Sequence, residues 1–388
     1  MNDKFILRKI TTSQEFKELK DKWNYLLEQS SQPNVFLTWE WLYTWWEFYS
    51  PGYKLFILLI SDQEGNLLGI APLCSALITP LKLKTLKFLG TEEVCSDHLD
   101  FILSKGMEKE LLSIFFRYLR ENPKEWDLLD LTDLSEKSNA IYFIQIWSSE
   151  NTYLFSVNTW TICPYASLPD NWEAFLKQLS ANSRKDIRRQ LRLLDESKKI
   201  NFSIVKNRDM VIPSMEKLFC LHTKRWSTIG EEGVFQRDRF TGFHRKIAQL
   251  FFDKGWLLIF ELSADKRFIA IYYNFLYSNR IYSYQSGIDS AWDNFSPGTV
   301  ALSLTIKSAI LNGIKEFDFL RGDAPYKYKW TDKNRMNLQL RVWNENLKAD
   351  FYRNAILYLD KTKKYAKKYL PDFAIKIFRA LWRKFGIV

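Results

Sequence analysis

The predicted elements of this chain occur twice in the same order, and this repetition constrains the fold more than any other feature. In each copy, two apolar strands joined by a tight turn precede a helix and a short buried strand. The copies comprise residues 53–73, 107–122 and 126–131, and then 256–276, 299–312 and 316–320. The order is kept while the residues differ, so we expect two lobes of similar architecture.

Alternating strand and helix patterns predict an α/β (α+β) chain in which each lobe is a mixed twisted sheet flanked by helices. The length of 388 residues fits about two domains. Prolines at Cys163-Pro164 and Leu168-Pro169 interrupt the pattern between the two copies. We therefore expect an N-terminal lobe at 1–165, a second lobe at 166–345 and a basic helical tail at 346–388.

Positive charge is concentrated in the tail. The net charge is +11, and residues 351–388 hold ten Lys or Arg against two Asp, which is +8 and leaves +3 for the rest. Phe373, Ile377, Leu381 and Phe385 recur at every fourth position and predict a basic amphipathic helix. Such a helix suits a membrane surface over residues 366–388. Docking on the protein body and a solvated basic helix are the alternatives.

The cysteines and histidines favour neither disulfides nor a metal site. None of the four cysteines stands in a C-x-x-C pair, and the three histidines lack zinc-binding spacing. The N-terminal segment is charged throughout, and no apolar run of about 18 residues occurs. These patterns predict no metal, no signal peptide and no transmembrane helix. We expect a cytoplasmic protein, with peripheral contact at the inner face of the membrane as a further option.

Residues 284–330 carry the most informative pattern. A strand ends at Gly287, a loop containing Asp289 and Ser296-Pro297-Gly298 follows, and a helix begins near Thr299. Free N–H groups and the dipole at a helix N-terminus bind anions. We therefore expect this turn to receive a pyrophosphate.

The order of segments closely resembles the CelD-like acetyltransferase domain of the GNAT superfamily, and also the Fem family of peptidoglycan aminoacyl transferases. The segments that carry the resemblance are Phe295-Ser296-Pro297-Gly298, Phe317-Asp318-Phe319, Gly322, Tyr326-Lys327-x-x-Trp330, Ser183 to Arg189, Leu221-His222-x-x-Arg225-Trp226, Trp39-Glu40-Trp41, Gly69 to Leu73, Phe88-Leu89-Gly90 and Ser96 to Asp100. Together they span roughly residues 35–330. The Gly-rich pyrophosphate loop of simple GNAT enzymes is absent, and only Gly298 stands in its place.

The resemblance implies two tandem GNAT-like lobes, of which the second is catalytic. It implies N-acyl transfer from acyl-coenzyme A, with acetyl-coenzyme A as the expected donor. The implied acceptor is an amine on a sugar, a polysaccharide or a cell-envelope precursor. An aminoacyl-tRNA donor of the Fem kind and a non-catalytic, membrane-associated partner in polysaccharide biosynthesis are the alternatives. Apart from such a tRNA, no nucleic-acid partner is expected.

The candidate site residues follow from the motif positions. Lys327 matches the functional lysine of the Fem-type ending, Tyr326 and Tyr284 are candidate proton donors, and Asp289 and Asp318 are candidate bases. Ser296, Pro297, Gly298 and Thr299 are expected to bind the donor phosphates, and Arg184 and Arg188 to bind phosphates or an anionic acceptor. A surface lysine, packed tyrosines and a solvated basic helix are the competing interpretations. His98, between Asp97 and Asp100, belongs to the other lobe and is interpreted as part of a polar loop.

Overall fold

The computed structural model describes residues 4–79, 81–197, 200–228 and 230–369, with only the backbone described for 194–197 and 359–369. The strands are β1 Phe5–Ile10, β2 Tyr53–Asp62, β3 Leu67–Ile78, β4 Leu83–Phe88, β5 Ile102–Leu103, β6 Leu128–Ser135, β7 Leu154–Ser167, β8 Ile200–Ile204, β9 Leu257–Ala264, β10 Arg267–Tyr277, β11 Arg280–Ile288, β12 Glu316–Asp318 and β13 Asn334–Trp343. The α-helices are α1 Ser13–Glu18, α2 Lys20–Gln29, α3 Trp39–Tyr49, α4 Glu108–Glu121, α5 Asn139–Glu150, α6 Trp172–Gln178, α7 Ala181–Ser197, α8 Val211–Thr228, α9 Asp238–Asp253, α10 Pro297–Leu311 and α11 Leu347–Tyr369. Of the 3₁₀ helices, η6 Ser290–Phe295 precedes α10, and η7 Lys327–Lys329 follows β12.

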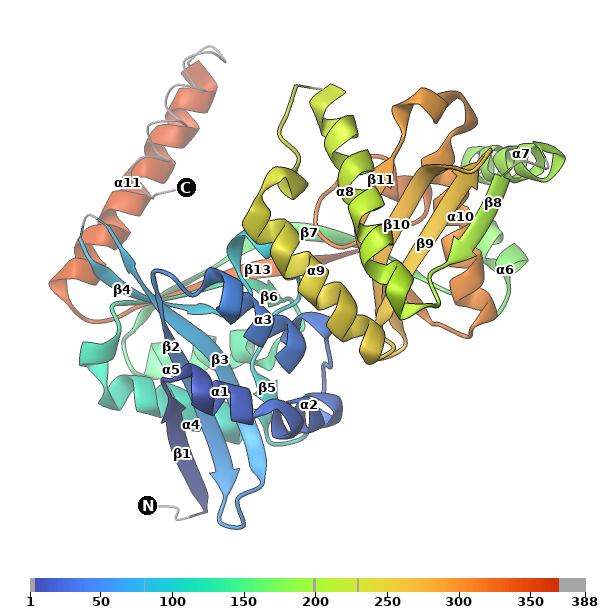
Figure 1. Ribbon diagram of the computed structural model, residues 1–388. Helices are drawn as coiled ribbons and strands as arrows, with labels where there is room; N and C mark the ends of the chain where they lie inside the picture. Colours follow the sequence, from blue (N-terminus) through green and yellow to red (C-terminus); the bar gives the residue numbers. More distant parts are fainter. Residues whose placement is uncertain (1–3, 80, 198–199, 229, 370–388) are drawn as a thin grey trace.

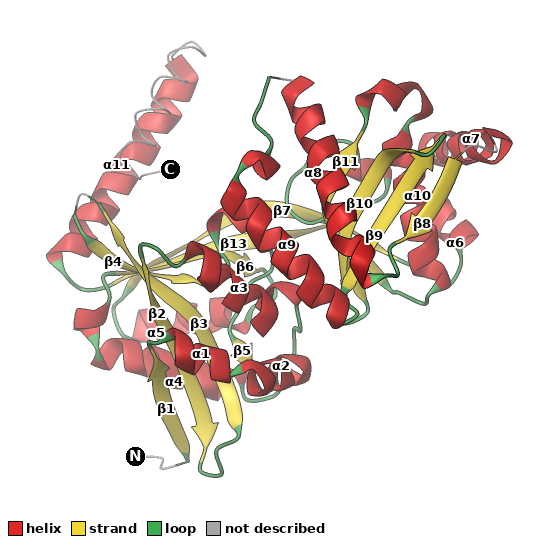
Figure 2. Ribbon diagram, in the orientation of Figure 1, coloured by secondary structure: helices red, strands yellow, loops and turns green. Residues whose placement is uncertain are grey.

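One mixed sheet runs through both lobes in the order β1-β2-β3-β4-β6-β13-β7-β12-β11-β10-β9-β8, with β5 added to β3. Helices cover both faces of it, as the two colours in Figure 2 show. The expected hairpins are present as β2–β3 and β9–β10. In each lobe a helix connects two parallel strands: α4 lies between β4 and β6, and α10 lies between β11 and β12. The predicted α/β fold of two similar lobes is confirmed.

The exchange of strands at the lobe junction departs from the expected division of the chain. β13 falls within the range expected for the second lobe, yet it pairs with β6 of the first lobe on one side and with β7 on the other. β7 in turn pairs with both β13 and β12. Because β7 completes the edges of both halves, the two sheets join into one, and no single residue divides the lobes.

Aromatic side chains join the lobes on the other side of this junction. Trp41 of α3 is fully buried and contacts Phe243 and Phe251 of α9 and Phe275 of β10. One hydrophobic cluster therefore extends across both lobes. Three further Trp of α3 are also buried. Because large rings contribute heavily to the energy of burial, α3 forms part of the core of both lobes. The expectation that this helix is buried on several sides is confirmed.

Candidate functional site

A wedge opens in the sheet of the second lobe between β11 and β12. The two parallel strands pair only at Arg280–Glu316, Ile281–Phe317 and Tyr282–Asp318. Beyond that point β12 gives way to a chain that follows β7, where Phe319 and Gly322 donate to Pro164 and Ile162. Within the described residues, no backbone hydrogen bond joins 283–288 to 319–326. The inner edge of β11 is therefore left without a strand partner.

The N-terminus of α10 stands at the end of β11, on one face of the sheet. Ser296 at its N-cap has a left-handed backbone, with φ of 47°, and its side chain caps no backbone N–H. Pro297 begins the helix, and the first turn contains no carboxylate. The hydroxyl of Tyr272 on β10 donates to the Gly298 carbonyl at 3.0 Å, which fixes the helix end against the sheet. The remaining N–H groups and the helix dipole favour an anion here.

The corresponding wedge of the first lobe is filled by the chain itself. β4 and β6 pair only at Thr85–Leu128 and Leu86–Leu129 before they diverge. Leu99 then lies beside β6, donating to the Asp133 carbonyl and accepting from the Ser135 N–H at 2.8 and 3.0 Å. The first turn of α4 also carries Glu108 and Glu110, which disfavour an anion at its N-terminus. Among the described residues, only the second lobe therefore leaves its diverging strand edge unpaired beside a helix end that favours anions.

Polar groups from three elements surround the mouth of this wedge. Lys329 of η7 donates to Thr299 at 3.3 Å and also pairs with Asp186 of α7. Gln190 of α7 donates to the Ser296 hydroxyl at 3.3 Å. These contacts place α7 next to the α10 N-terminus, although the sequence had singled out other residues of that helix.

Two further side chains lie at the mouth, and one of them is a cation without a partner. Tyr326 is 55% exposed and lies close enough to Tyr272 to influence its pKa. The charge of Arg225 on α8 acts on both of these tyrosines. In the described part of the chain its guanidinium has no ion pair or hydrogen bond. An exposed, unpaired arginine is suited to bind a phosphate.

Lys327 is buried under the loop that follows β12. Its ammonium donates to the carbonyls of Leu320 and Arg321 at 2.9 and 2.7 Å. Leu320 is left-handed, with φ of 57°, so the lysine holds a strained turn in place. Burial lowers the pKa of Lys327, while Asp97 opposes that shift. This side chain is neither the surface lysine of the competing interpretation nor directed freely into the wedge.

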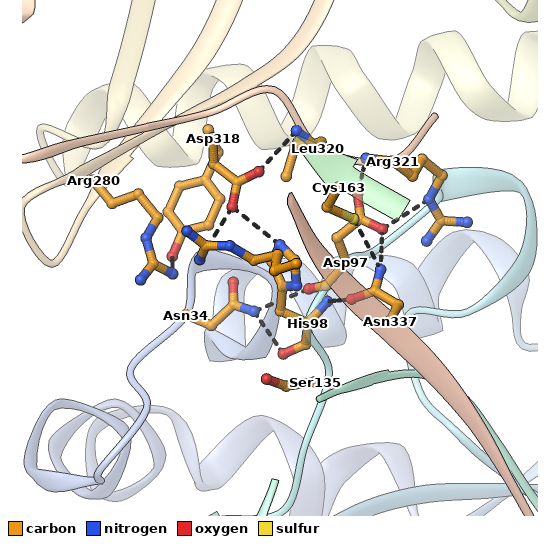
Figure 3. A network of polar contacts seen from close by, with 12 residues as sticks. Asn34, Asp97, His98, Ser135, Cys163, Arg280, Asp318, Leu320, Arg321 and Asn337 are labelled. Carbon is orange, nitrogen blue, oxygen red and sulfur yellow. Dashed lines mark hydrogen bonds and ion pairs between the residues drawn. The ribbon is translucent and has the colours of Figure 1, made fainter. Parts of the chain in front are cut away.

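Asp318 is the last residue of β12 that pairs with β11, and its side chain contacts His98 of the first lobe (Figure 3). Its Oδ2 is 3.1 Å from His98 Nε2 and 3.5 Å from Arg335, and its Oδ1 accepts from the Leu320 N–H at 2.8 Å. Burial alone would raise the pKa of Asp318, but the charge and hydrogen bond of His98, with Arg335, hold it at about 2. A fully buried carboxylate with these partners is better described as a structural charge than as the general base suggested by its sequence position.

A second buried charge cluster joins the lobes beside it. Arg321 donates to Asp97 at 2.9 Å, and Asn337 of β13 donates to Asp97 at 2.6 Å (Figure 3). Arg321 also donates to Asp133 at 2.7 Å. Arg321, Asp133 and Asn337 were not predicted from the sequence to have a role. Buried ion pairs of this kind fix geometry more than they add stability. These bonds fix the position of the loop after β12 relative to the first lobe.

The remaining predicted catalytic residues occupy different surroundings. Asp289 caps η6 and pairs with Lys224 of α8 at 2.8 Å, and this hydrogen bond holds its pKa below the usual range. The hydroxyl of Tyr284 donates to the Val94 carbonyl at 2.7 Å and lies 3.1 Å from His244 Nε2. Burial raises the pKa of Tyr284 well above its usual value. Tyr284 thus faces the first lobe, and Asp289 stands at the open end of β11.

The two predicted phosphate-binding arginines of α7 have local partners. Arg184 donates to the Leu179 carbonyl at 3.0 Å and to the Lys177 carbonyl at 3.3 Å, closing the turn between α6 and α7. Arg188 pairs with Glu173 at 2.6 Å on the surface. Neither bond connects the arginine to the wedge. Ser296, Pro297, Gly298 and Thr299, in contrast, lie together at its mouth.

Comparison with known proteins assigns the wedge to a family. Residues 181–328 match the family model described as an acetyltransferase (GNAT) domain. This part of the chain is therefore a GNAT-type domain. The match begins with α7 and ends in η7, so the GNAT domain includes β11, β12, α10 and the mouth residues other than Lys329. No curated protein matches the chain in sequence.

Solved structures share the fold of the whole chain. FemX superposes with a TM-score of 0.60 at 11% identity, covering 90% of this chain and 99% of that one. A conserved protein of unknown function from Bacteroides thetaiotaomicron gives 0.53 at 8% identity, covering 87% and 100%. At these identities the likeness concerns the fold alone. It shows that the GNAT domain sits in a FemX-like arrangement of two lobes.

The described residues include neither a candidate metal centre nor a candidate membrane-spanning helix. They contain no cluster of three His, Cys, Asp or Glu side chains that could hold a metal ion. None of the helices in the same residues combines enough length with enough apolar character to span a bilayer.

Proposed function

We propose that the second lobe transfers an acyl group from acyl-coenzyme A, with acetyl-coenzyme A as the first candidate, to an amine on a sugar, polysaccharide or cell-envelope precursor. The observation that carries the proposal is the divergence of β11 and β12 after Tyr282–Asp318, next to an α10 N-terminus free of acidic residues. An extended acyl carrier that enters the wedge can pair with the inner edge of β11. Its pyrophosphate then meets the N–H groups after Ser296, where Arg225 and Lys329 add positive charge.

The reaction needs a stabilised oxyanion and groups that move protons. Tyr284 is the extra residue of a β-bulge, because Gln285 pairs with Tyr273 while Ser283 pairs with Asn274. Bulges redirect backbone groups and occur often beside active sites. In the proposed reaction, a backbone N–H of this bulge binds the developing oxyanion, a contact typically worth about 3 kcal/mol. The amine attacks the carbonyl carbon, the thioester bond breaks, and the sulfur leaves with the electron pair.

Tyr326 and Asp289 are the proposed proton-transfer groups. Tyr326 is exposed at the mouth, near the Gly298 end of α10, where it can protonate the departing thiolate. Of the two candidate bases, only Asp289 reaches solvent, with its side chain 18% exposed against 0% for Asp318. Lys327 acts through the loop that it holds, since both of its described bonds go to backbone carbonyls.

Calorimetry with acetyl-coenzyme A and with free coenzyme A tests the donor. We expect saturable binding of both at one site, and release of free coenzyme A when acetyl-coenzyme A is incubated with an amino sugar. Absence of heat with both ligands would reject this donor. The aminoacyl-tRNA alternative rests on the Fem-like position of Lys327 and predicts instead binding of charged tRNA that weakens steeply with salt.

A further inference from the structure

Helix α11 has two apolar faces, of which only one packs on the body. Ala349, Tyr352 and Ile356 lie on the inner face, where Ala349 and Tyr352 join a small cluster with Trp343 of β13. Beyond these contacts the helix leaves the body beside β4 and extends away from it (Figure 1). Packing on the body therefore explains why Ala349, Tyr352 and Ile356 are apolar.

The outer face of α11 carries large apolar side chains in solvent. Leu347, Phe351 and Tyr358 are 89%, 63% and 69% exposed. Their spacing of four and seven residues places them on one stripe of the helix, about half a turn from the buried Ala349 and Ile356. A solvated helix would not need such a stripe, and a contiguous exposed apolar surface marks an interaction site.

Lysines gather at the base of the same stripe. An open hollow of about 830 Å³ lies between β4, the chain before β6 and the start of α11. Lys84, Lys124 and Lys348 line it together with Leu347. Only Asp127 and Glu345 oppose them within the lining, and Asp127 is already bonded to Asn346 and the Lys84 N–H. The hollow and the apolar stripe meet at Leu347.

We propose that the outer face of α11 and this lysine-lined hollow form one docking surface for an anionic lipid bilayer. The apolar stripe enters the interface between headgroups and acyl chains, and the lysines meet negatively charged headgroups. Charge favours a bilayer over a second copy of this chain, because α11 and the residues after it are strongly basic and would repel themselves. Residues 351–388 carry +8, ten Lys or Arg less two Asp. The amphipathic segment expected at 366–388 lies outside the described residues from 370 on, so the surface proposed here is a separate one.

Co-sedimentation of the full chain with vesicles tests the surface. Wild type should bind phosphatidylcholine–phosphatidylglycerol vesicles and bind pure phosphatidylcholine vesicles at least tenfold more weakly. Salt should release it, because salt screens the attraction between lysines and anionic headgroups. Phe351→Ser/Tyr358→Ser and Lys124→Gln/Lys348→Gln should each lower binding by about tenfold.

Matched controls separate the surface from general effects. Tyr142→Ser removes an aromatic ring that is 70% exposed on α5, and Lys105→Gln/Lys266→Gln removes two exposed lysines elsewhere. Both controls should bind as wild type does. Equal binding of wild type and the α11 variants would overturn the proposal. So would light scattering that shows a wild-type dimer which Phe351→Ser/Tyr358→Ser dissociates, since a second copy would then cover the stripe.

Discussion

His98 Nε2 lies 3.1 Å from Asp318 Oδ2, although 220 residues separate the two in the chain. The contact joins a loop of the first lobe to the last residue of β12, at the point where the wedge begins. It thereby ties the geometry of the wedge to the arrangement of the lobes. The two residues were assigned to different lobes and different roles from the sequence, and only the fold brings them together.

Replacement of Asp318 by Asn should cost about 3 kcal/mol at neutral pH, because it leaves Arg335 without its buried counter-charge and His98 without its carboxylate partner. The pKa of Asp318 is lowered from 3.8 to about 2. The carboxylate therefore stabilises the fold fully above about pH 4, and this contribution is lost as the pH falls towards 2. Urea unfolding from about pH 6 to pH 3 should show the gap between wild type and variant narrowing. A gap that widens on acidification would contradict the assignment.

Asp100 should produce the opposite pH dependence. Burial raises its pKa from 3.8 to about 7, although Ser138 and the Phe101 N–H donate to it. The protonated carboxyl group of Asp100 therefore contributes fully to the free energy of unfolding below about pH 4. This contribution is lost as the pH rises to about 7, and the loss is at most roughly 4 kcal/mol. Asp100→Asn keeps an acceptor oxygen and should remove this loss. Urea denaturation of wild type and Asp100→Asn at about pH 4 and about pH 7 measures this loss. If the free energy of unfolding changes equally with pH in both proteins, the prediction is wrong.

Lys327→Met should destabilise the protein by roughly 2–4 kcal/mol, since two carbonyls of a strained loop lose their donor. Lys327→Arg should restore less than half of this, because a planar guanidinium fits such a site poorly. Thermal melts and acyl-transfer rates are measured on the same samples. If Lys327→Met melts as wild type does but has lost activity, the residue contacts substrate, and the structural role proposed for it is wrong.

A carboxylate placed at the α10 N-terminus should weaken donor binding. Thr299→Glu reproduces the acidic first turn of α4 and can also neutralise Lys329. We expect about a tenfold rise in the dissociation constant for coenzyme A, from a helix-end effect of about 1–2 kcal/mol. Ser113→Glu makes the same charge change on an exposed position of α4 and should leave binding unaltered. Equal loss in both variants would point to net charge instead of the helix end.

Local patterns were sufficient for the elements that build the wedge. The apolar runs of β9, β10 and β12 and the Ser296-Pro297-Gly298 turn predict a strand pair, a helix start and a buried strand. The structure begins α10 at Pro297, two residues before the expected start. Such elements depend on near neighbours in sequence, which is why a single chain reveals them.

Long-range pairing decided what local patterns could not. β13 joins β6 and β7 through residues about 200 and 180 positions away, so its place between the lobes has no local signal. The bonds of Arg184 to nearby carbonyls and of Asp318 to His98 likewise depend on where distant segments meet. Asp97, His98 and Asp100 stand directly before the apolar run from Phe101 to Leu103, and this was a local hint that the loop is buried.

Hydrogen–deuterium exchange with and without acetyl-coenzyme A tests the central claim most directly. If the open wedge of the second lobe binds the donor, protection should increase at 283–288 and at 296–300. Residues 97–100 and the start of α4 should be unaffected, since Leu99 already fills that wedge. Protection of the first lobe alone, or of neither lobe at saturating ligand, would contradict the account.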